Sequence, residues 1–285
     1  MPSNSSESDS NLRFPSDRQV EPSHAGDPRT RPLGLPLLWG ALGVLVQIRL
    51  CYWAGRDVSW QAIIPLVSGL TLILGGMALR REKIVPSGTS PRYGRILLLG
   101  GAVVGFAAGV PFGLWALGAA LLLLFSNALS QRLAFIHDLV IAILAASVFL
   151  GTATALNGIL LGGYPAAFAF FFFLAWSATL AVETCKDDLQ NRRLTLATLV
   201  GPRAALVTSG ILFFIFGIIT TWPFLRESYS STYFWFIAIG VDLPLLWMWG
   251  KLRGRDKQLS ESAIVKFNQR ARWLTFVILL ALLFA

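Results

Sequence analysis

Long apolar stretches, separated by short charged or Pro/Gly-rich connections, make up most of the chain after residue 31. An α-helix needs about 20 mostly apolar residues to cross the hydrocarbon core of a bilayer. The apolar residues run consecutively and do not alternate with polar ones, which argues against transmembrane β-strands. We therefore predict an all-α fold, a polytopic membrane bundle of about nine transmembrane helices, at residues 33–54, 59–79, 95–110, 112–126, 133–156, 164–183, 202–222, 232–250 and 271–285.

The third and fourth stretches are short, and only residues 110–112, which include a proline, separate them. A single bent helix with a re-entrant piece is therefore an alternative, and it gives eight spans. The basic residues favour nine, because nine spans put every Lys and Arg on one side except Arg49, Arg56 and Arg226. Basic residues concentrate in cytoplasmic loops, so we predict a cytoplasmic N-terminus and an external C-terminus.

Composition narrows the class of protein further. Residues 1–31 are polar and contain no apolar run, so we predict a disordered cytoplasmic tail before a transmembrane domain at residues 32–285. An apolar fraction of 55% and a charged fraction of 14% exclude a soluble domain. The net charge of +9 lies mostly in loops between spans, so no nucleic-acid partner is predicted. Cys51 and Cys185 lack the spacing of a zinc site or a disulfide framework.

The densest polar cluster lies at residues 180–201, LAVETCKDDLQNRRLTLATLVG, where an apolar stretch ends. Glu183, Lys186 and Asp187 are spaced i, i+3 and i+4, so on a helix they share one face. Carboxylate oxygens suit magnesium, and cationic side chains suit a diphosphate. The same residues are also compatible with ordinary charges at the membrane boundary.

Two further connections are candidates for binding. Residues 79–95 contain five basic residues and a single acid, a composition that attracts phosphate groups or anionic lipid headgroups and also fits the positive-inside signal. Residues 125–142 place His137 and Asp138 at the start of a span, and such an isolated pair is more often structural than catalytic.

Asp242 lies near the middle of the eighth apolar stretch, beside Pro244. A carboxylate at that depth is costly, so it should face the bundle interior and have a partner, for which Arg49 is a candidate. A functional role and a structural one, in which Asp242 bonds backbone groups freed by the proline, both remain open.

Together the three connections resemble, in order, the three cytoplasmic signatures of the UbiA family of intramembrane prenyltransferases, over most of residues 33–285. The PSG at residues 86–88 resembles the end of the family's first motif, and Arg80 and Lys83 occupy its basic positions. Phe125, Ser126 and Leu129 match the family's YSxxLKxxxxxGN pattern.

The third signature resembles the family's second aspartate motif. Glu183, Lys186 and Asp187 match its opening, and the TLA at residues 195–197 with Gly201 resembles its close. The pattern is closest to the naphthoate prenyltransferase branch.

The resemblance implies an enzyme of the cytoplasmic (inner) membrane, with helices around a central cavity open to lipid. Such enzymes hold a polyprenyl diphosphate through Mg²⁺ on two acidic motifs and transfer the prenyl group to a quinone-precursor-like aromatic or other lipid acceptor. The residues implied are Arg80, Lys83, Lys186 and Arg192 for the diphosphate, Glu183, Asp187 and Asp188 for the metal, and Asp138, Asn191 and Asp242 as further candidates.

The chain departs from the family pattern where metal ligands are expected. The NDxxD of the first motif falls at Ser68, Gly69 and Leu72, and a further expected acid falls at Gly76, so every carboxylate of that motif is absent. The second motif is shortened, with Gln190 and Asn191 in place of acids. A non-catalytic relative that binds an isoprenoid lipid or stabilises a partner enzyme is therefore the alternative hypothesis. A transporter of unrelated fold is disfavoured, because we find no inverted repeat.

Overall fold

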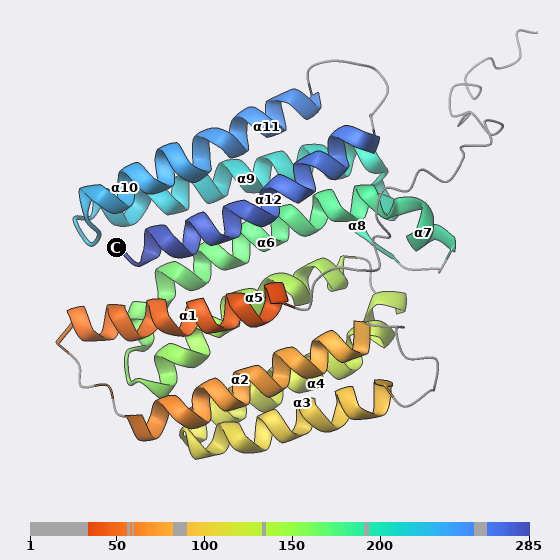
Figure 1. Cartoon of the computed structure of the whole chain (residues 1–285). Coiled ribbons are helices and arrows are strands. Elements are labelled where there is room, and N and C mark those ends of the chain that lie inside the picture. The colour runs from red at the N-terminus through yellow and green to blue at the C-terminus, as the bar shows by residue number, and fades with distance from the viewer. Residues whose placement is uncertain are drawn as a thin grey trace, which may run out of the picture. The chain divides into compact units, whose positions relative to one another are not determined.

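The protein is described by a computed structural model over residues 34–55, 58, 60–81, 90–132, 135–190, 194–253 and 261–285. Every regular element in these ranges is a helix, as the apolar pattern predicts. The long helices run side by side and the chain reverses at each end of the bundle (Figure 1). The elements are α1 (Gly34–Trp53), α2 (Trp60–Arg81), α3 (Ser90–Ala107), α4 (Val110–Arg132), α5 (Ile136–Ala155), η1 (Ile159–Gly162), α6 (Gly163–Glu183), α7 (Cys185–Gln190), α8 (Leu196–Val200), α9 (Pro202–Leu225), α10 (Ser231–Ile237), η2 (Ala238–Asp242), α11 (Leu243–Arg253) and α12 (Glu261–Leu282).

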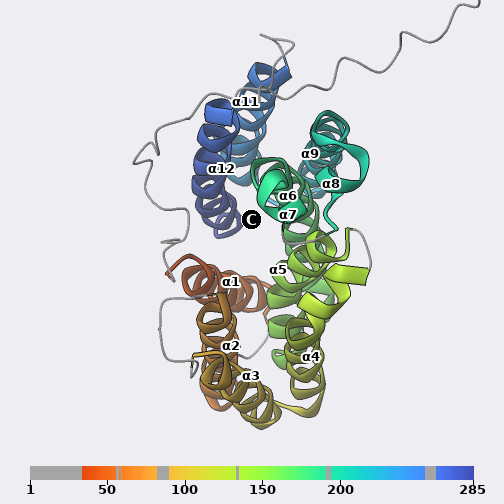
Figure 2. The ribbon, with the colours of Figure 1, turned by 90° about the vertical axis from the view of Figure 1, so that its right-hand side faces the viewer.

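Helix α6 is central, with α5, α9 and α12 packed around it (Figure 2). Its aromatic residues form much of the core. Phe168 and Phe172 are fully buried, and the ring of Phe172 contacts the rings of Trp176, Phe213 and Phe216. In a bilayer, close packing of this kind holds helices together, because lipid tails are as apolar as the side chains.

Helices α3 and α4 are separate, so the alternative of one bent helix is wrong. Gly109 adopts a φ of 132°, which other residues rarely adopt, and the chain reverses there. The two helices then pack closely, since a Cβ added at Gly105 would lie 3.0 Å from the Cβ of Ala116. Figure 2 shows α2, α3 and α4 as one group of helices.

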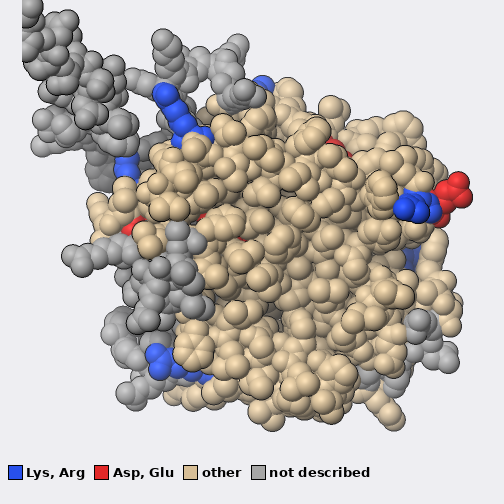
Figure 3. All heavy atoms as spheres, turned by 180° about the vertical axis from the view of Figure 1, so that it is seen from behind, with Lys and Arg blue, Asp and Glu red and all other residues tan. Residues whose placement is uncertain are grey.

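Four segments of the described chain are long and apolar enough to span a membrane: Asp138–Ala155, Ile159–Glu183, Pro202–Leu225 and Ser231–Leu252. Shorter apolar helices run over Tyr93–Phe106 and Val110–Ser126. On the face seen from behind, the charged side chains lie mainly toward the two ends, and the middle is almost wholly uncharged (Figure 3). This surface fits a bilayer, and the count of nine spans stays a prediction.

Two helix boundaries differ most from the predicted ones. Helix α12 begins at Glu261 and not at 271, and α4 continues to Arg132. The first turns of α12 are amphipathic: Ile264 and Phe267 are buried, whereas Lys266 is exposed. A search for continuous apolar residues therefore misses this part of the helix.

The eighth apolar stretch contains a wider turn. Helix α10 passes into the π-helical turn η2, and α11 follows from Leu243. Pro244 has no N–H to donate to the Gly240 carbonyl, as a regular α-helix would require. Such π-turns inside α-helices occur often at functional sites.

Candidate functional site

The polar segments singled out in the sequence approach one end of the bundle, the end that carries α7 and α8 (Figure 1). Helices α2, α4 and α6 end there, and α3, α5 and α9 begin there. Helix α6 leads into α7 through Thr184, whose N–H donates to the Leu180 carbonyl. The predicted carboxylates and cation of residues 183–188 therefore lie on a nearly continuous helical path.

Glu183 points toward α12. Its Oε2 accepts a hydrogen bond from Nδ2 of Asn268 over 2.6 Å, and Oδ1 of Asn268 accepts one from the Thr179 hydroxyl over 2.9 Å. This chain of hydrogen bonds joins α6 to α12. One oxygen of Glu183 is therefore already bound by the protein.

Asp188 of α7 is buried. Its Oδ2 accepts a hydrogen bond from the Thr184 hydroxyl over 2.8 Å, and only 7% of the residue is exposed. Asp138, at the first turn of α5, is 2% exposed and lies near Asp188, the Ser177 hydroxyl and the Leu196 amide. Its Oδ2 has no hydrogen-bond partner among the described residues. Four helices thus bring two carboxylates together.

Burial, with a smaller contribution from the Asp188 carboxylate, raises the pKa of the neighbouring Cys185 thiol above its ordinary value. The thiol is therefore mostly protonated at neutral pH.

Of the other predicted site residues, Lys186 and Asp187 follow on α7, where both are exposed. Lys83, Asn191 and Arg192 lie outside the described residues, as does the side chain of Arg80. The sequence predicts that Glu183, Lys186 and Asp187 share one helix face. In the structure Glu183 bonds to Asn268, whereas the side chains of Lys186 and Asp187 are exposed.

No cluster of three or more acidic, His or Cys side chains in the described ranges has the geometry of a metal site. Magnesium does not require such a cluster, because it usually binds one or two carboxylates together with water and substrate phosphates. Asp138 and Asp188 supply two neighbouring carboxylates, and Asp187 adds an exposed one beside them. These residues fit a magnesium ion that a diphosphate helps to hold.

Sequence analysis missed the residues that orient these acids. Asn268 binds Glu183 from α12, and Thr184 binds Asp188 from the adjoining turn. An asparagine within an otherwise buried helix face was an available signal for the first. Nothing in the sequence could assign its partner across the bundle.

The first-motif positions on α2 have a packing role. Gly69 is buried against α3, where an added Cβ would lie 3.1 Å from the Gly101 carbonyl oxygen. A Cβ at Gly101 would lie 2.8 Å from the Gly69 carbonyl oxygen. The two backbones touch at the position predicted to carry a family carboxylate, and Ser68 beside them is half-buried.

Asp242 lies within the helix pair α9 and η2–α11, away from the end that carries α7. Its Oδ2 accepts from the Thr220 hydroxyl over 3.2 Å. The expected pairing with Arg49 is wrong, because the Arg49 guanidinium donates to the Leu283 carbonyl and lies over the Trp53 ring. The first-span cation thus anchors the C-terminal turn.

Comparison with known proteins gives a consistent result. A model of the UbiA prenyltransferase family matches residues 77–271. A search of curated proteins found no match. One similar solved structure is that of a digeranylgeranylglyceryl phosphate synthase, with 17% identity, a TM-score of 0.69, and 87% of this chain and 91% of the other covered.

Two further solved structures are UbiA homologues. The apo homologue from Aeropyrum pernix K1 has 13% identity and a TM-score of 0.62, with 88% of this chain and 94% of the other covered. The homologue from Archaeoglobus fulgidus, bound to GPP and Mg²⁺, has 16% identity and a TM-score of 0.58, with 88% and 99% covered. At these identities the likeness shows a shared fold.

Proposed function

The chain belongs to the UbiA prenyltransferase family, and on this premise we propose that it transfers a polyprenyl group from its diphosphate to a quinone-precursor-like aromatic or other lipid acceptor. The single observation that carries the proposal is the α6–α7 path. It brings carboxylates and a cation to one end of a largely apolar bundle, an arrangement that suits a diphosphate joined to an isoprenoid chain.

The proposed site assigns separate roles to acids and bases. Asp188 and Asp187, with the neighbouring Asp138, would hold magnesium, which when bound neutralises charge on the departing diphosphate. Glu183, which the sequence also offered, is bound by Asn268. Lys186 and the basic residues Arg80, Lys83 and Arg192 bind the diphosphate oxygens. The apolar helices below keep water from the allylic cation that forms as the diphosphate leaves. The solved homologue bound to GPP and Mg²⁺ supports a donor and a cofactor of this type.

A non-catalytic role in binding an isoprenoid lipid is the second candidate, and the α2–α3 contact favours it. Gly69 packs against Gly101, so α2 has no room there for the acid of an ordinary first motif. A protein of this kind binds prenyl diphosphate without turnover. The further suggestion of a partner enzyme has no support in the contacts of the described chain.

Reconstituted protein distinguishes the two candidates. The purified chain in lipid vesicles is given radiolabelled prenyl diphosphates of several lengths and a panel of aromatic and lipid acceptors, with and without Mg²⁺. We expect magnesium-dependent product that Asp187→Asn reduces at least tenfold. Glu227→Gln removes an exposed acid after α9, at the opposite end of the bundle, and is the matched control. Diphosphate binding without product across the whole panel would instead establish the non-catalytic role.

We also infer nine spans, with the N-terminus in the cytoplasm. The support is the concentration of Lys and Arg on one side together with the separate helices α3 and α4. Reporter domains fused to each terminus test this inference. Nine spans put the two reporters on opposite sides of the inner membrane, whereas an even number puts them on the same side.

A further inference from the structure

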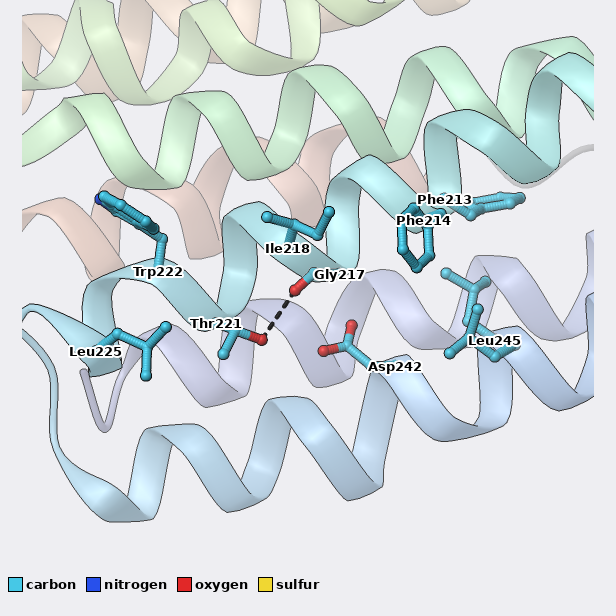
Figure 4. A pocket seen from close by; sticks show the side chains of 10 residues that line it. Phe213, Phe214, Gly217, Ile218, Thr221, Trp222, Leu225, Asp242 and Leu245 are labelled. Carbon is cyan, nitrogen blue, oxygen red and sulfur yellow. Dashed lines mark hydrogen bonds between the residues drawn. The ribbon is translucent and has the colours of Figure 1, made fainter.

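A groove on the outside of the bundle lies between α9 and the η2–α11 segment (Figure 4). It has a volume of about 470 Å³, which is within the range of small-molecule pockets. Its walls are almost entirely apolar, and several of its side chains are exposed on the outer surface, among them Phe214, Ile218, Trp222 and Leu246. In a membrane this groove faces lipid.

Asp242 is the one acidic residue in the wall of this groove. In Figure 4 its carboxylate points from η2 toward Gly217 and Thr221 of α9. The π-helical turn that precedes Pro244 ends at this residue, so the irregular backbone positions the acid. A midspan carboxyl group is costly unless it is hydrogen-bonded.

The protein satisfies this carboxyl group only in part. Oδ1 of Asp242 is buried and has no hydrogen-bond partner in the described part of the chain. Oδ2 has only the Thr220 hydroxyl, at 3.2 Å. That hydroxyl carries a single proton, and the carbonyl oxygens of Phe216, at 3.1 Å, and Gly217, at 3.0 Å, compete for it. Thr221, the other hydroxyl in the wall, donates to the Gly217 carbonyl over 2.9 Å.

We propose that this groove binds a membrane lipid consisting of an apolar chain with one terminal hydroxyl, and that the hydroxyl bonds to Asp242. The apolar walls accommodate the chain. A hydroxyl fits the carboxyl group because it can donate to a carboxylate and accept from a carboxylic acid, whereas an ammonium group satisfies only the charged form. A fully apolar lipid would leave the carboxyl group with the shared Thr220 hydroxyl alone.

This second lipid site is independent of the prenyl-transfer proposal. It uses α9 and α11, and none of its lining residues comes from α6 or α7. A protein without transferase activity would retain it, and an active enzyme would retain activity after its loss.

The test uses a matched pair of ligands. The full-length chain in vesicles is labelled with a prenyl alcohol that carries a photoactivatable diazirine, and the labelled peptides are identified by mass spectrometry. Unlabelled prenyl alcohol and its methyl ether, which has the same chain without the O–H, then compete. We expect labelling of α9 and α11 peptides, and at least tenfold stronger competition by the alcohol. A long-chain alkylphenol in a parallel arm distinguishes phenols from aliphatic alcohols.

Two variants separate the polar contact from the apolar one. Asp242→Leu should reduce the preference for alcohol over ether to about onefold while the ether still binds. Gly217→Leu should block both ligands, because the leucine side chain occupies part of the groove. The change should not disturb the fold, since an added Cβ would meet only the Asp242 carboxyl carbon, at 4.0 Å. Gly118→Leu is the control, since an added Cβ there meets nothing within 4 Å.

Three results would overturn the proposal: equal competition by alcohol and ether in the unmodified chain, an unchanged preference in Asp242→Leu, or labelling confined to other helices. Prenyl-transfer activity, measured on the same preparations, should stay within twofold of the unmodified chain. Its loss in both groove variants would mean that the groove belongs to the transfer site.

Discussion

The α2–α3 pair and the α6–α7 path reach the same end of the bundle, but they use their motif positions differently. On α2 the position predicted for a family carboxylate is Gly69, whose backbone packs against Gly101 of α3. On α6–α7 the carboxylates are present, and the protein itself binds two of them through Asn268 and Thr184. In the first region a closely packed glycine stands where a carboxylate is predicted. In the second region hydrogen bonds hold the carboxylates in fixed positions. The described acids that fit a metal therefore lie on α5 and α7.

Placing an acid on α2 should have the largest effect on folding stability. Gly69→Asp puts a Cβ 3.1 Å from the Gly101 carbonyl oxygen and 3.4 Å from the Gly105 nitrogen, and a carboxylate between two helices. Overpacking and a buried charge together should cost about 3 kcal/mol or more of folding stability. Thermal unfolding followed by tryptophan fluorescence in detergent measures the loss.

Gly100→Asp is the matched control, because an added Cβ at that position of α3 meets nothing within 4 Å. Equal unfolding temperatures for the two variants would mean that α2 and α3 are not closely packed. In that case α2 would have room for an acid, and the contrast between the two regions would disappear.

Removing the donor to Glu183 should have an intermediate effect. Asn268→Leu leaves the Glu183 carboxylate without its donor on α12, while the Thr179 hydroxyl keeps the Trp176 carbonyl as an acceptor at 2.7 Å. The expected loss of folding stability is about 1–3 kcal/mol, the usual cost of leaving a buried polar group unpaired. Gln269→Leu changes the exposed neighbouring amide and should leave the unfolding temperature almost unchanged.

Removing the hydroxyl beside Asp188 should have a smaller effect. Thr184→Val takes away the donor that lies 2.8 Å from Oδ2, and we expect a loss of about 1 kcal/mol. Thr184→Ser keeps the hydroxyl and should preserve stability. If both variants unfold at the same temperature, Asp188 is not held by Thr184, and the α6–α7 carboxylates are less fixed than we infer.

The smallest effect is a change in cysteine reactivity. Burial, and to a lesser extent the Asp188 carboxylate, raises the pKa of Cys185, so its alkylation should be slow at neutral pH and should accelerate as the pH rises toward that pKa. Asp188→Asn removes the charge, lowers the pKa, and should speed alkylation at pH 8 about twofold to fivefold. A water-soluble reagent with peptide mass spectrometry measures the rate. Fully buried Cys51 is the internal control, and a slower rate in the variant would contradict the proposed proximity.

The helical fold could be predicted from the sequence because its signal is local. The apolar run at 164–183 corresponds to α6 almost residue for residue, and Pro202 and Gly201 mark the start of α9. In the first turns of α12 polar residues interrupt the apolar run, so the run does not predict where this helix begins. The same local motifs identified the family.

The site could be predicted only as a set of residues near one end. Contacts such as Glu183 with Asn268, and Gly69 with Gly101, join positions far apart in the chain, and no local pattern encodes them. Asp242 is instructive: its cost in a membrane correctly called for a polar partner, but Thr220 and not Arg49 supplies it. Energetic rules specify that a partner is needed, and packing decides which one.

The π-helical turn at Ala238–Asp242 also adds a residue to its span without turning the residues that follow it. A π-turn rotates the chain less per residue than the about 100° of an α-helix, so an extra residue fits within it. Deleting one residue there should restore a regular α-helix and leave Trp247 and Lys251, whose ammonium lies 3.5 Å from the indole ring centroid, on the face they occupy now. The deletion would remove only the widened turn that presents Asp242 to the groove.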